Sequence, residues 1–457
     1  MIAPSSILPL PLSLFGLFFP HNSFEFAPVP ADQRIANAWS LNSRPESMIS
    51  RPEQTDILIA GGGMVGLCLA LALARGGLGV TIVEPMTADA MTDDRFDGRV
   101  SALAFAGVRM LRALGVWPRL ESNAQPINDI LISDGSLERS TSPLSLHFDH
   151  REIGETLGHI VENRDIRAGL FAEIEDEPRI SLMTRVAVEA LVIEPGGARV
   201  SLSSGTDMIA TLCIGADGRD SPLRERQEIQ TVAWDYPQTG IVTTVAHERP
   251  HQGVAYEHFL PAGPFAILPM TANRSSLVWT ERSADAARMM KLGEADFARE
   301  IGRRFGDHLG KVTPEGPRWS YPLRLELARA YVKKRFALVG DAAHTIHPIA
   351  GQGLNLGLKD VAALTETILD AARLGLDYGE EDCLKRYERW RRFDSFALAA
   401  ATDGVNRLFS NDIPPLRLAR DLGLGIVDQI APLRRFFMRH AGGDIGRLPR
   451  LLKGEAA

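Results

Sequence analysis

Residues 340–360 combine one carboxylate with closely spaced glycines. The apolar run 336–339 before them predicts a buried strand, and a helix is predicted after them. Gly351 and Gly353 leave backbone N–H groups bare at the start of that helix, where partial positive charge accumulates. Asp341, directly past the strand, can hold sugar hydroxyls. A cofactor that carries hydroxyls and develops negative charge suits such a site, and a flavin fits this description.

A second glycine cluster lies near the other end of the chain. The apolar run 56–60 predicts a strand, and Gly61, Gly63 and Gly66 follow it with the spacing G-x-G-x-x-G. In this motif the glycines allow a tight turn, close approach to a pyrophosphate, and close packing of helix on strand. Taken by itself, this glycine spacing is only weak evidence for a dinucleotide-binding site.

The elements around these glycines strengthen the signal. A helix rich in Ala and Leu is predicted over 67–74, and a second strand over 80–83 ends on Glu84. A carboxylate at that place can bond ribose hydroxyls, and its charge would repel a 2′-phosphate. The alternative is a tight turn between strand and helix that binds no ligand.

A third strand-to-loop transition lies between these two. Residues 210–214 read as a strand, and Asp217 and Gly218 follow as a turn. Alone, the pair would be read as an ordinary Asp-Gly turn. Three such transitions together point to one cofactor that spans several strand tips.

Two histidines inside the first segment raise the question of a metal. His344 and His347 are three residues apart, but no third ligand follows at a suitable spacing, so no metal site is predicted. No Ser-His-Asp, Cys-His or paired-carboxylate arrangement emerges either. The demanding chemistry is therefore expected to be that of the cofactor.

The elements that would position these residues predict an α/β protein of more than one domain. The chain has 457 residues, which exceeds a comfortable single core. Residues 186–193 and 200–202 read as a hairpin around 195–197. Residues from about 236 to 324 alternate apolar and polar in short runs, which predicts an antiparallel sheet whose one face would cover the flavin ring.

The net charge of −7 argues against nucleic acid as a partner. Three widely spaced cysteines, Cys68, Cys213 and Cys383, predict buried thiols in a reducing compartment and no disulfide framework. Residues 1–47 are predicted to be a disordered extension or an over-called start, with translation from Met48. They offer neither a basic signal-peptide start nor a long apolar span.

Together the three motifs resemble the single-component flavoprotein aromatic hydroxylases, and most closely the ubiquinone-biosynthesis FAD-dependent hydroxylase family. The resemblance covers residues from about 55 to 443, and its most specific part is 340–360. It implies a p-hydroxybenzoate hydroxylase-like fold: a Rossmann-like FAD-binding domain with an inserted antiparallel-sheet substrate domain and a C-terminal helical part. The implied boundaries are 1–50 for the N-terminal extension; 53–125, 152–235 and 325–400 for the FAD-binding domain; 126–151 and 236–324 for the substrate domain; and 401–457 for the helical part.

The resemblance also implies roles for individual residues. The FAD pyrophosphate would lie at Gly61, Gly63 and Gly66, and the adenosine ribose at Glu84. Asp341, after Gly340, would bind the ribityl chain. The remaining cofactor contacts would come from Arg99, Asn163, Asp217, Leu354 and Asn355. Pro348, Gly351, Gln352 and Gly353 would position the flavin ring, and no side chain is assigned as a catalytic acid or base.

The implied activity is a monooxygenase that hydroxylates the ring of a polyprenylated phenol through a flavin C4a-hydroperoxide, with NADH, NADPH or another protein as electron donor. The implied partners are the prenylated phenol, oxygen, a ubiquinone-biosynthesis protein complex and a peripheral contact with the inner membrane from the cytoplasm. Residues 434–440, rich in Arg and Phe, would suit such a surface, although an apolar stripe docked on the protein is the favoured reading. The alternatives are a same-fold monooxygenase of a small soluble aromatic, a flavin-dependent dehydrogenase or reductase, and a non-catalytic flavin-binding scaffold.

Overall fold

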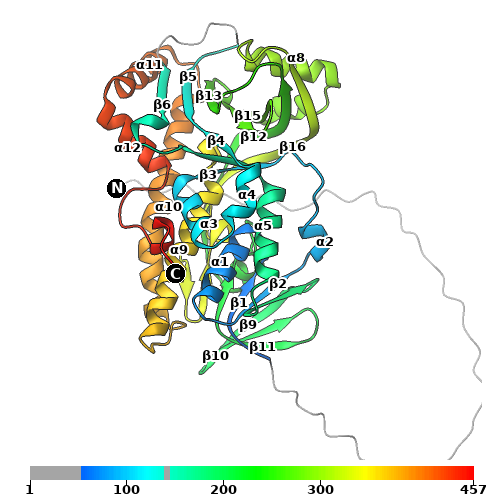
Figure 1. Ribbon diagram of the computed structural model, residues 1–457, viewed down its shortest axis with the longest axis vertical. Helices are drawn as coiled ribbons and strands as arrows, with labels where there is room; N and C mark the ends of the chain where they lie inside the picture. The colour runs from blue at the N-terminus through cyan, green and yellow to red at the C-terminus, as the bar shows by residue number, and fades with distance from the viewer. Residues whose placement is uncertain (1–52, 138–144) are drawn as a thin grey trace, which may run out of the picture. The chain divides into compact units, whose positions relative to one another are not determined.

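The computed structural model describes residues 53–137 and 145–457. The predicted N-terminal extension lies outside this range. A mainly parallel sheet forms the centre of the lower part of Figure 1. Its main strands run in the order β17 (Val332–Lys333), β18 (Phe336–Leu338), β11 (Asp207–Gly215), β1 (Glu53–Ala60), β2 (Val80–Glu84) and β8 (Ile180–Thr184).

The pairing within this sheet brings the predicted loops to one edge. Strand β1 is parallel to β11 and β2, and β11 is parallel to β18. The carboxyl ends of β1, β2, β11 and β18 therefore meet at the same edge, which is where open α/β sheets bind ligands. The predicted hairpin is confirmed as β9 (Val188–Glu194) and β10 (Gly197–Leu202), which pairs antiparallel with β11.

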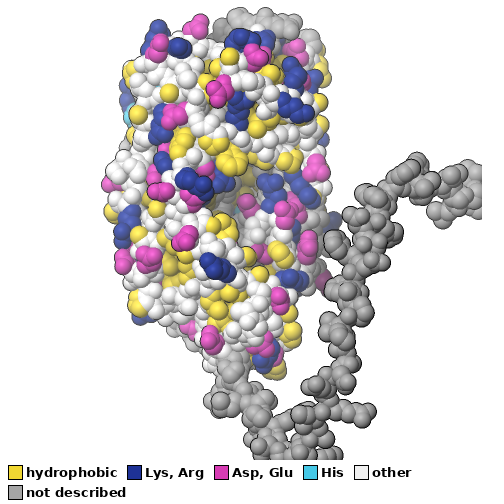
Figure 2. All heavy atoms as spheres, turned by 90° about the vertical axis from the view of Figure 1, so that its right-hand side faces the viewer, with side chains coloured by type: hydrophobic (Ala, Val, Ile, Leu, Met, Phe, Trp, Pro, Cys, Tyr) yellow, Lys and Arg dark blue, Asp and Glu magenta, His cyan; other side chains and the backbone are white. Residues whose placement is uncertain are grey.

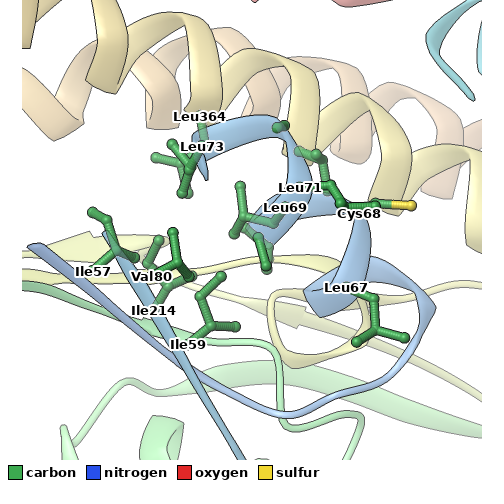
Figure 3. Packing of buried hydrophobic residues seen from close by; sticks show 14 of the residues in the cluster. Ile57, Ile59, Leu67, Cys68, Leu69, Leu71, Leu73, Val80, Ile214 and Leu364 are labelled. Atoms are coloured by element: carbon green, nitrogen blue, oxygen red, sulfur yellow. The ribbon is translucent and has the colours of Figure 1, made fainter. Parts of the chain in front are cut away.

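Two helices with bare amino termini pack beside this sheet. Helix α1 (Met64–Arg75) and helix α9 (Gln352–Arg373) are both apolar on the side that faces the core. Figure 3 shows Leu69 and Leu73 of α1 pointing toward Ile57 and Val80 of the sheet, with Leu364 of α9 beside them. This fully buried cluster holds both helix starts against the strand tips.

A second sheet lies in the upper part of Figure 1. Its strands follow the order β19 (His344–Thr345), β16 (Val312–Ala328), β12 (Thr231–His247), β15 (Arg274–Arg282), β14 (Gly263–Met270), β13 (Val254–Leu260), β5 (Asp129–Asp134) and β6 (Ser145–Asp149). The pairs are antiparallel, as the alternation predicts, except that β13 and β5 run parallel. Helices α7 (Ser283–Met290) and α8 (Glu294–Phe305) pack on one face of the sheet.

A small sheet connects the two larger ones. It consists of β3 (Val100–Ala104), β7 (Gly158–Glu162) and β4 (Gln125–Ile127), and α5 (Asn163–Glu175) follows β7 directly. Asn355 ties this small sheet to helix α9, which packs beside the first sheet: its Nδ2 donates to the carbonyl oxygen of Ala102 at 2.8 Å. The start of α9 and strand β3 are thereby held side by side.

The C-terminal region is helical, as expected. Its helices are α10 (Glu381–Phe409), α11 (Pro414–Gln429) and α12 (Ala431–Ala441). Helix α10 runs unbroken through residue 400, which the sequence suggests as a boundary, and packs along α9. Among the described residues, no helix is both long and apolar enough to cross a bilayer. Cys68 and Cys213 are buried and all three cysteines are free thiols, as predicted.

Candidate active site

Gly61 and Gly63 of the first motif lie in the turn from β1 to α1, and Gly66 lies in the first turn of α1. The three glycines differ in what surrounds them. A Cβ atom at Gly61 would lie 2.3 Å from the carbonyl oxygen of Ala216, and one at Gly66 would lie 2.0 Å from that of Gly61. Gly63 is exposed, and a Cβ there would meet no atom within 4 Å. Gly61 and Gly66 are therefore required by the fold itself, whereas the protein's own atoms leave room for a side chain at position 63.

Helix α1 begins at this open position without a capping side chain or an acidic residue in its first turn. Its first N–H groups are therefore free to bind an anion such as a pyrophosphate. Glu84, buried at the end of β2, closes the turn: its carboxylate accepts from the N–H of Gly62 at 2.7 Å and of Met86 at 2.9 Å. A carboxylate has lone pairs left over for a ribose hydroxyl.

We expect Gly63→Ala to weaken FAD binding by roughly 1–3 kcal/mol, because the added methyl group would crowd the pyrophosphate. The thermal stability of the apoprotein should not change, since a Cβ at this position enters open space. Flavin titration and a melting curve would test this. Gly66→Ala is the matched control: its Cβ overlaps Gly61, so the fold itself should be lost. A Gly63→Ala protein that binds FAD like the wild type would contradict this role.

In the second loop at a strand end, which follows β11, the side chain of Asp217 accepts hydrogen bonds from nearby residues of the same loop. Asp217 accepts a hydrogen bond from Ser221 Oγ at 2.6 Å and one from the N–H of Leu223 at 3.2 Å. Burial raises the pKa of its carboxyl. Ala216 lies against Gly61, so this loop adjoins the first one. In the described structure Asp217 serves as a turn-forming residue, and its contact with the cofactor remains a prediction.

The third loop carries Asp341 beside the start of α1. A Cβ at Gly340, where φ is +60°, would lie 3.2 Å from Val65. The Asp341 side chain is exposed, yet neighbouring protein atoms still displace enough water to raise the pKa of its carboxyl. No described residue donates a hydrogen bond to this carboxyl. An outward-facing carboxyl without a partner suits a hydroxyl-bearing chain such as ribityl.

Replacing Asp341 with alanine should weaken FAD binding by roughly 1.5–3 kcal/mol, which is the typical contribution of hydrogen bonds to a charged group. The dissociation constant, measured by quenching of flavin fluorescence, would rise roughly tenfold to 150-fold. Asp341→Asn keeps the shape of the side chain and should therefore lose less FAD affinity than Asp341→Ala. Equal affinities for wild type and both variants would show that the ribityl chain lies elsewhere.

Helix α9 presents the second bare helix start. Gly351 caps it in the left-handed conformation, with φ of +61°, and no acidic residue occupies its first turn. Gly353 is exposed, and a Cβ there would meet nothing within 4 Å. Partial positive charge at this place could stabilise a negatively charged flavin edge. Pro348 precedes the helix, and Leu354 is half-buried against the core.

The side chain of Asn355 bonds to strand β3: Nδ2 donates to the carbonyl oxygen of Ala102, and Oδ1 accepts from the N–H of Ala104 at 2.9 Å. These contacts hold the start of α9 against β3. The contact of Asn355 with the cofactor remains a prediction.

Arg99 and Asn163 lie next to each other, and their predicted contact with the cofactor remains a prediction. The N–H of Asn163 donates to the carbonyl oxygen of Arg99 at 3.0 Å, and Ser101 Oγ donates to Asn163 Oδ1 at 2.7 Å. Arg99 is exposed, pairs with Asp97 at 2.6 Å, and lies over the ring of Trp319. Across the described residues, no cluster of three or more His, Cys, Asp or Glu could hold a metal ion.

Sequence reasoning missed the residues that hold the third loop in place. Asp360 is fully buried in α9, and its carboxylate accepts from the N–H of Gly340 at 2.9 Å and pairs with His344 Nε2 at 2.5 Å. Arg391 of α10 donates to it at 2.8 Å. Burial alone would raise the pKa of Asp360, but His344 and Arg391 hold the pKa below its ordinary value.

Arg224 supports the same loop from the other side. It is buried, donates to the carbonyl oxygen of Ala342 at 3.0 Å, and pairs with Glu326 at 2.9 Å. These contacts join residues far apart in the chain, and the only sequence signal was that Asp360 ends the segment 340–360.

Known proteins are similar to this chain over most of its length. The profile of the FAD binding domain family matches residues 54–400. The ubiquinone hydroxylase UbiL of Rhodospirillum rubrum is 48% identical over 408 residues, which cover 89% of this chain and 94% of that protein. The chain belongs to the FAD-dependent ubiquinone-biosynthesis hydroxylase family. The 3-demethoxyubiquinol 3-hydroxylase of Escherichia coli is 36% identical over 394 residues, covering 86% of this chain and 99% of that one.

Solved structures support the fold. The p-nitrophenol 4-monooxygenase PnpA of Pseudomonas putida superposes with a TM-score of 0.71 at 17% identity, covering 87% of this chain and all of that chain. The predicted p-hydroxybenzoate hydroxylase-like fold, the FAD cofactor and the class of FAD-dependent monooxygenase are thereby confirmed. The open positions at Gly63 and Gly353 and the unpaired Asp341 fit FAD. The roles of the individual residues remain predictions.

Proposed function

We propose that this monooxygenase hydroxylates the aromatic ring of a polyprenylated phenol in ubiquinone biosynthesis. The observation that carries the proposal is the 48% identity with a ubiquinone hydroxylase over 94% of that protein's length. Bound FAD would accept electrons from NADH, NADPH or a protein donor and activate oxygen. The protein would bind the cofactor at the strand tips and place its ring between the start of α9 and the second sheet.

Deletion of the gene tests this directly. The strain should lose ubiquinone and accumulate a prenylphenol that lacks one hydroxyl group, and the purified protein should insert one atom of ¹⁸O from ¹⁸O₂ into that compound. Conversion of only a small soluble aromatic would favour the second monooxygenase reading. Product without ¹⁸O would indicate a dehydrogenase or reductase, and normal ubiquinone after deletion would refute the pathway.

We propose that the enzyme works at the cytoplasmic surface of the inner membrane, because its substrate would be dissolved in lipid. An exposed apolar surface on α11 and α12 supports this. Its members and exposed fractions are Leu422 (51%), Ile426 (56%), Ile430 (45%), Phe436 (51%) and Phe437 (41%). Arg435 and Arg439 are exposed beside the two phenylalanines and suit anionic lipid headgroups. Within residues 434–440, Met438 is docked in a core cluster, whereas the rings of Phe436 and Phe437 are exposed.

The face drawn in Figure 2 is different, because its basic and acidic side chains are interspersed. Such a mixed surface, together with the net charge of −7, does not favour a nucleic acid as partner. A protein complex of ubiquinone biosynthesis remains the alternative occupant of the α11–α12 surface.

The double variant Phe436→Ser, Phe437→Ser should bind vesicles of phosphatidylcholine and phosphatidylglycerol at least about tenfold more weakly than wild type, since each half-buried ring contributes on the order of 1 kcal/mol. Leu374→Ser is the matched control, because Leu374 is 74% exposed and lies outside this surface. Vesicle flotation measures both. Equal flotation of the double variant and the control would show that Phe436 and Phe437 do not bind the membrane.

A further inference from the structure

Glu257 is a carboxyl placed among apolar side chains in the middle of the second sheet. It lies on β13, opposite Ala266 of β14 and Ile132 of β5. The pairing has no register shift along β13, so Glu257 shares a face with Ala255 and Phe259, its neighbours at two residues' distance. A charged side chain at such a position is unusual.

This face packs in a cluster that reaches strand β3, which lies beside the start of α9. The opposite face, with Tyr256 and Leu260, packs on α7 and α8. Ala255, Phe259 and Ile132 belong instead to a cluster that includes Ala102 of β3. Ala102 lies beside Gly351: a Cβ built on Gly351 would be 3.1 Å from its methyl group.

The Glu257 carboxyl has no partner. Neither a side chain nor a backbone group in residues 53–137 and 145–457 donates a hydrogen bond to it. The only charged side chain with which it shares a face on β5 is Asp134, which is neutralised by Arg420 of α11 at 2.9 Å. On the other face of β13, His258 bonds to Ser133. Removal from water raises the pKa of the Glu257 carboxyl to about 7, and no nearby cation opposes this.

The Glu257 carboxyl contributes no hydrogen bond or ion pair to the described part of the fold. Buried carboxyls that stabilise a fold are hydrogen-bonded or paired with a cation, and unsatisfied ones concentrate at functional sites. The side chain is also only half-buried, although its surroundings are those of an interior position. It is therefore both removed from bulk solvent and accessible to a small group.

We propose that Glu257 contacts the phenolic hydroxyl of the aromatic substrate and accepts its proton while the ring is hydroxylated. This inference rests on the proposed function. The O–H bond of the phenol breaks, its electron pair stays on the phenolic oxygen and makes the ring more nucleophilic, and the proton forms a new O–H bond on the carboxylate. The apolar neighbours on the same face would pack against the ring.

Binding measurements test the contact. The probes are 2-farnesylphenol and its O-methyl ether, each titrated into FAD-loaded protein without a reductant. Wild type should bind the phenol at least tenfold more tightly than the ether. Glu257→Leu should bind both alike, while Glu189→Gln, a change at an exposed glutamate of β9, should keep the wild-type preference.

A rate measurement tests the proton transfer. Chemically reduced FAD-loaded enzyme with bound 2-farnesylphenol is mixed with oxygen, and hydroxylated product is followed in a single turnover. In wild type the rate should rise with pH through about 7, because only the ionised carboxylate accepts a proton. Glu257→Gln should lose this rise and be roughly 100-fold slower at pH 8, and Glu257→Asp should partly restore it.

The outcomes separate two failures. If neither phenol nor ether binds to wild type, the proposed prenylphenol substrate is wrong. If wild type binds and hydroxylates the phenol but the Glu257 variants keep both the preference and the pH profile, the substrate stands and the role of Glu257 is overturned.

Discussion

Replacement of Asp360 with alanine is expected to lower the free energy of unfolding by roughly 3–5 kcal/mol, because it leaves a buried charge without its partner. Arg391 is 2% exposed, and its Nε donates to Asp360 at 2.8 Å. The same carboxylate holds the N–H of Gly340 and the ring of His344. Its loss should therefore also displace Asp341, so that the purified variant carries little FAD. Urea denaturation and the flavin content of the purified protein measure the two effects.

Asp394→Ala is the matched control. Asp394 also pairs with Arg391, at 2.8 Å, but its side chain is 48% exposed. Half-exposed ion pairs contribute at most about 1 kcal/mol, so this variant should stay close to wild type in stability and FAD content. If Asp360→Ala proved no less stable than Asp394→Ala, the buried network would not be what holds the loop.

The parts of the site that could be predicted from sequence are those set by local spacing. Gly61, Gly63 and Gly66 lie within six residues, and their spacing alone places them where strand β1 passes into helix α1. Gly351 and Gly353 likewise mark the start of α9. Parallel pairing then brings such loops to one edge, so the position of the cofactor site follows from a few short patterns.

For the second sheet, the sequence predicts that the strands are antiparallel but not where each strand begins and ends. The apolar run 241–245 predicts a short strand, whereas β12 spans Thr231–His247. Its pairing with β16 shifts register between Asp235 and Thr239 and again between Val242 and Thr244. Those irregular stretches break the alternation of apolar and polar residues on which a sequence-based prediction of a strand depends. Pairing of β12 with β15 and β16 extends the strand nonetheless.

Contacts between distant residues account for what was missed at the site. Asp360 and Arg391 are separated by a turn and lie on different helices, and neither has a spacing that predicts the pair. The sequence did contain a weak indication that Glu257 is buried. It lies two residues from both Ala255 and Phe259, so in a strand all three side chains are on the same face. A charged residue in such a pattern is usually read as an exposed one, and only the pairing with β5 and β14 shows the face it shares.

Glu257→Gln is expected to stabilise the apoprotein at pH 8 by about 3 kcal/mol and to have little effect at pH 4.5. The pKa of this carboxyl rises from 4.5 in the unfolded chain to about 7 in the folded one. The folded state is therefore favoured while the group is protonated, and this stability is lost as the pH rises from 4.5 through 7. The difference of about 2.5 pH units corresponds to about 3 kcal/mol. Glutamine has the same shape and does not ionise, so the variant should keep the stability that wild type loses as the pH rises.

Urea denaturation of wild type and variant at the two pH values measures this. Glu189→Gln should show no such pH-dependent gain, since Glu189 is exposed. A Glu257→Gln variant with the same stability difference from wild type at both pH values would mean that the carboxyl ionises normally and is well hydrated. The predicted gain, combined with loss of the rise in rate near pH 7, would instead show that the fold tolerates an unfavourable carboxyl because the chemistry at the ring requires it.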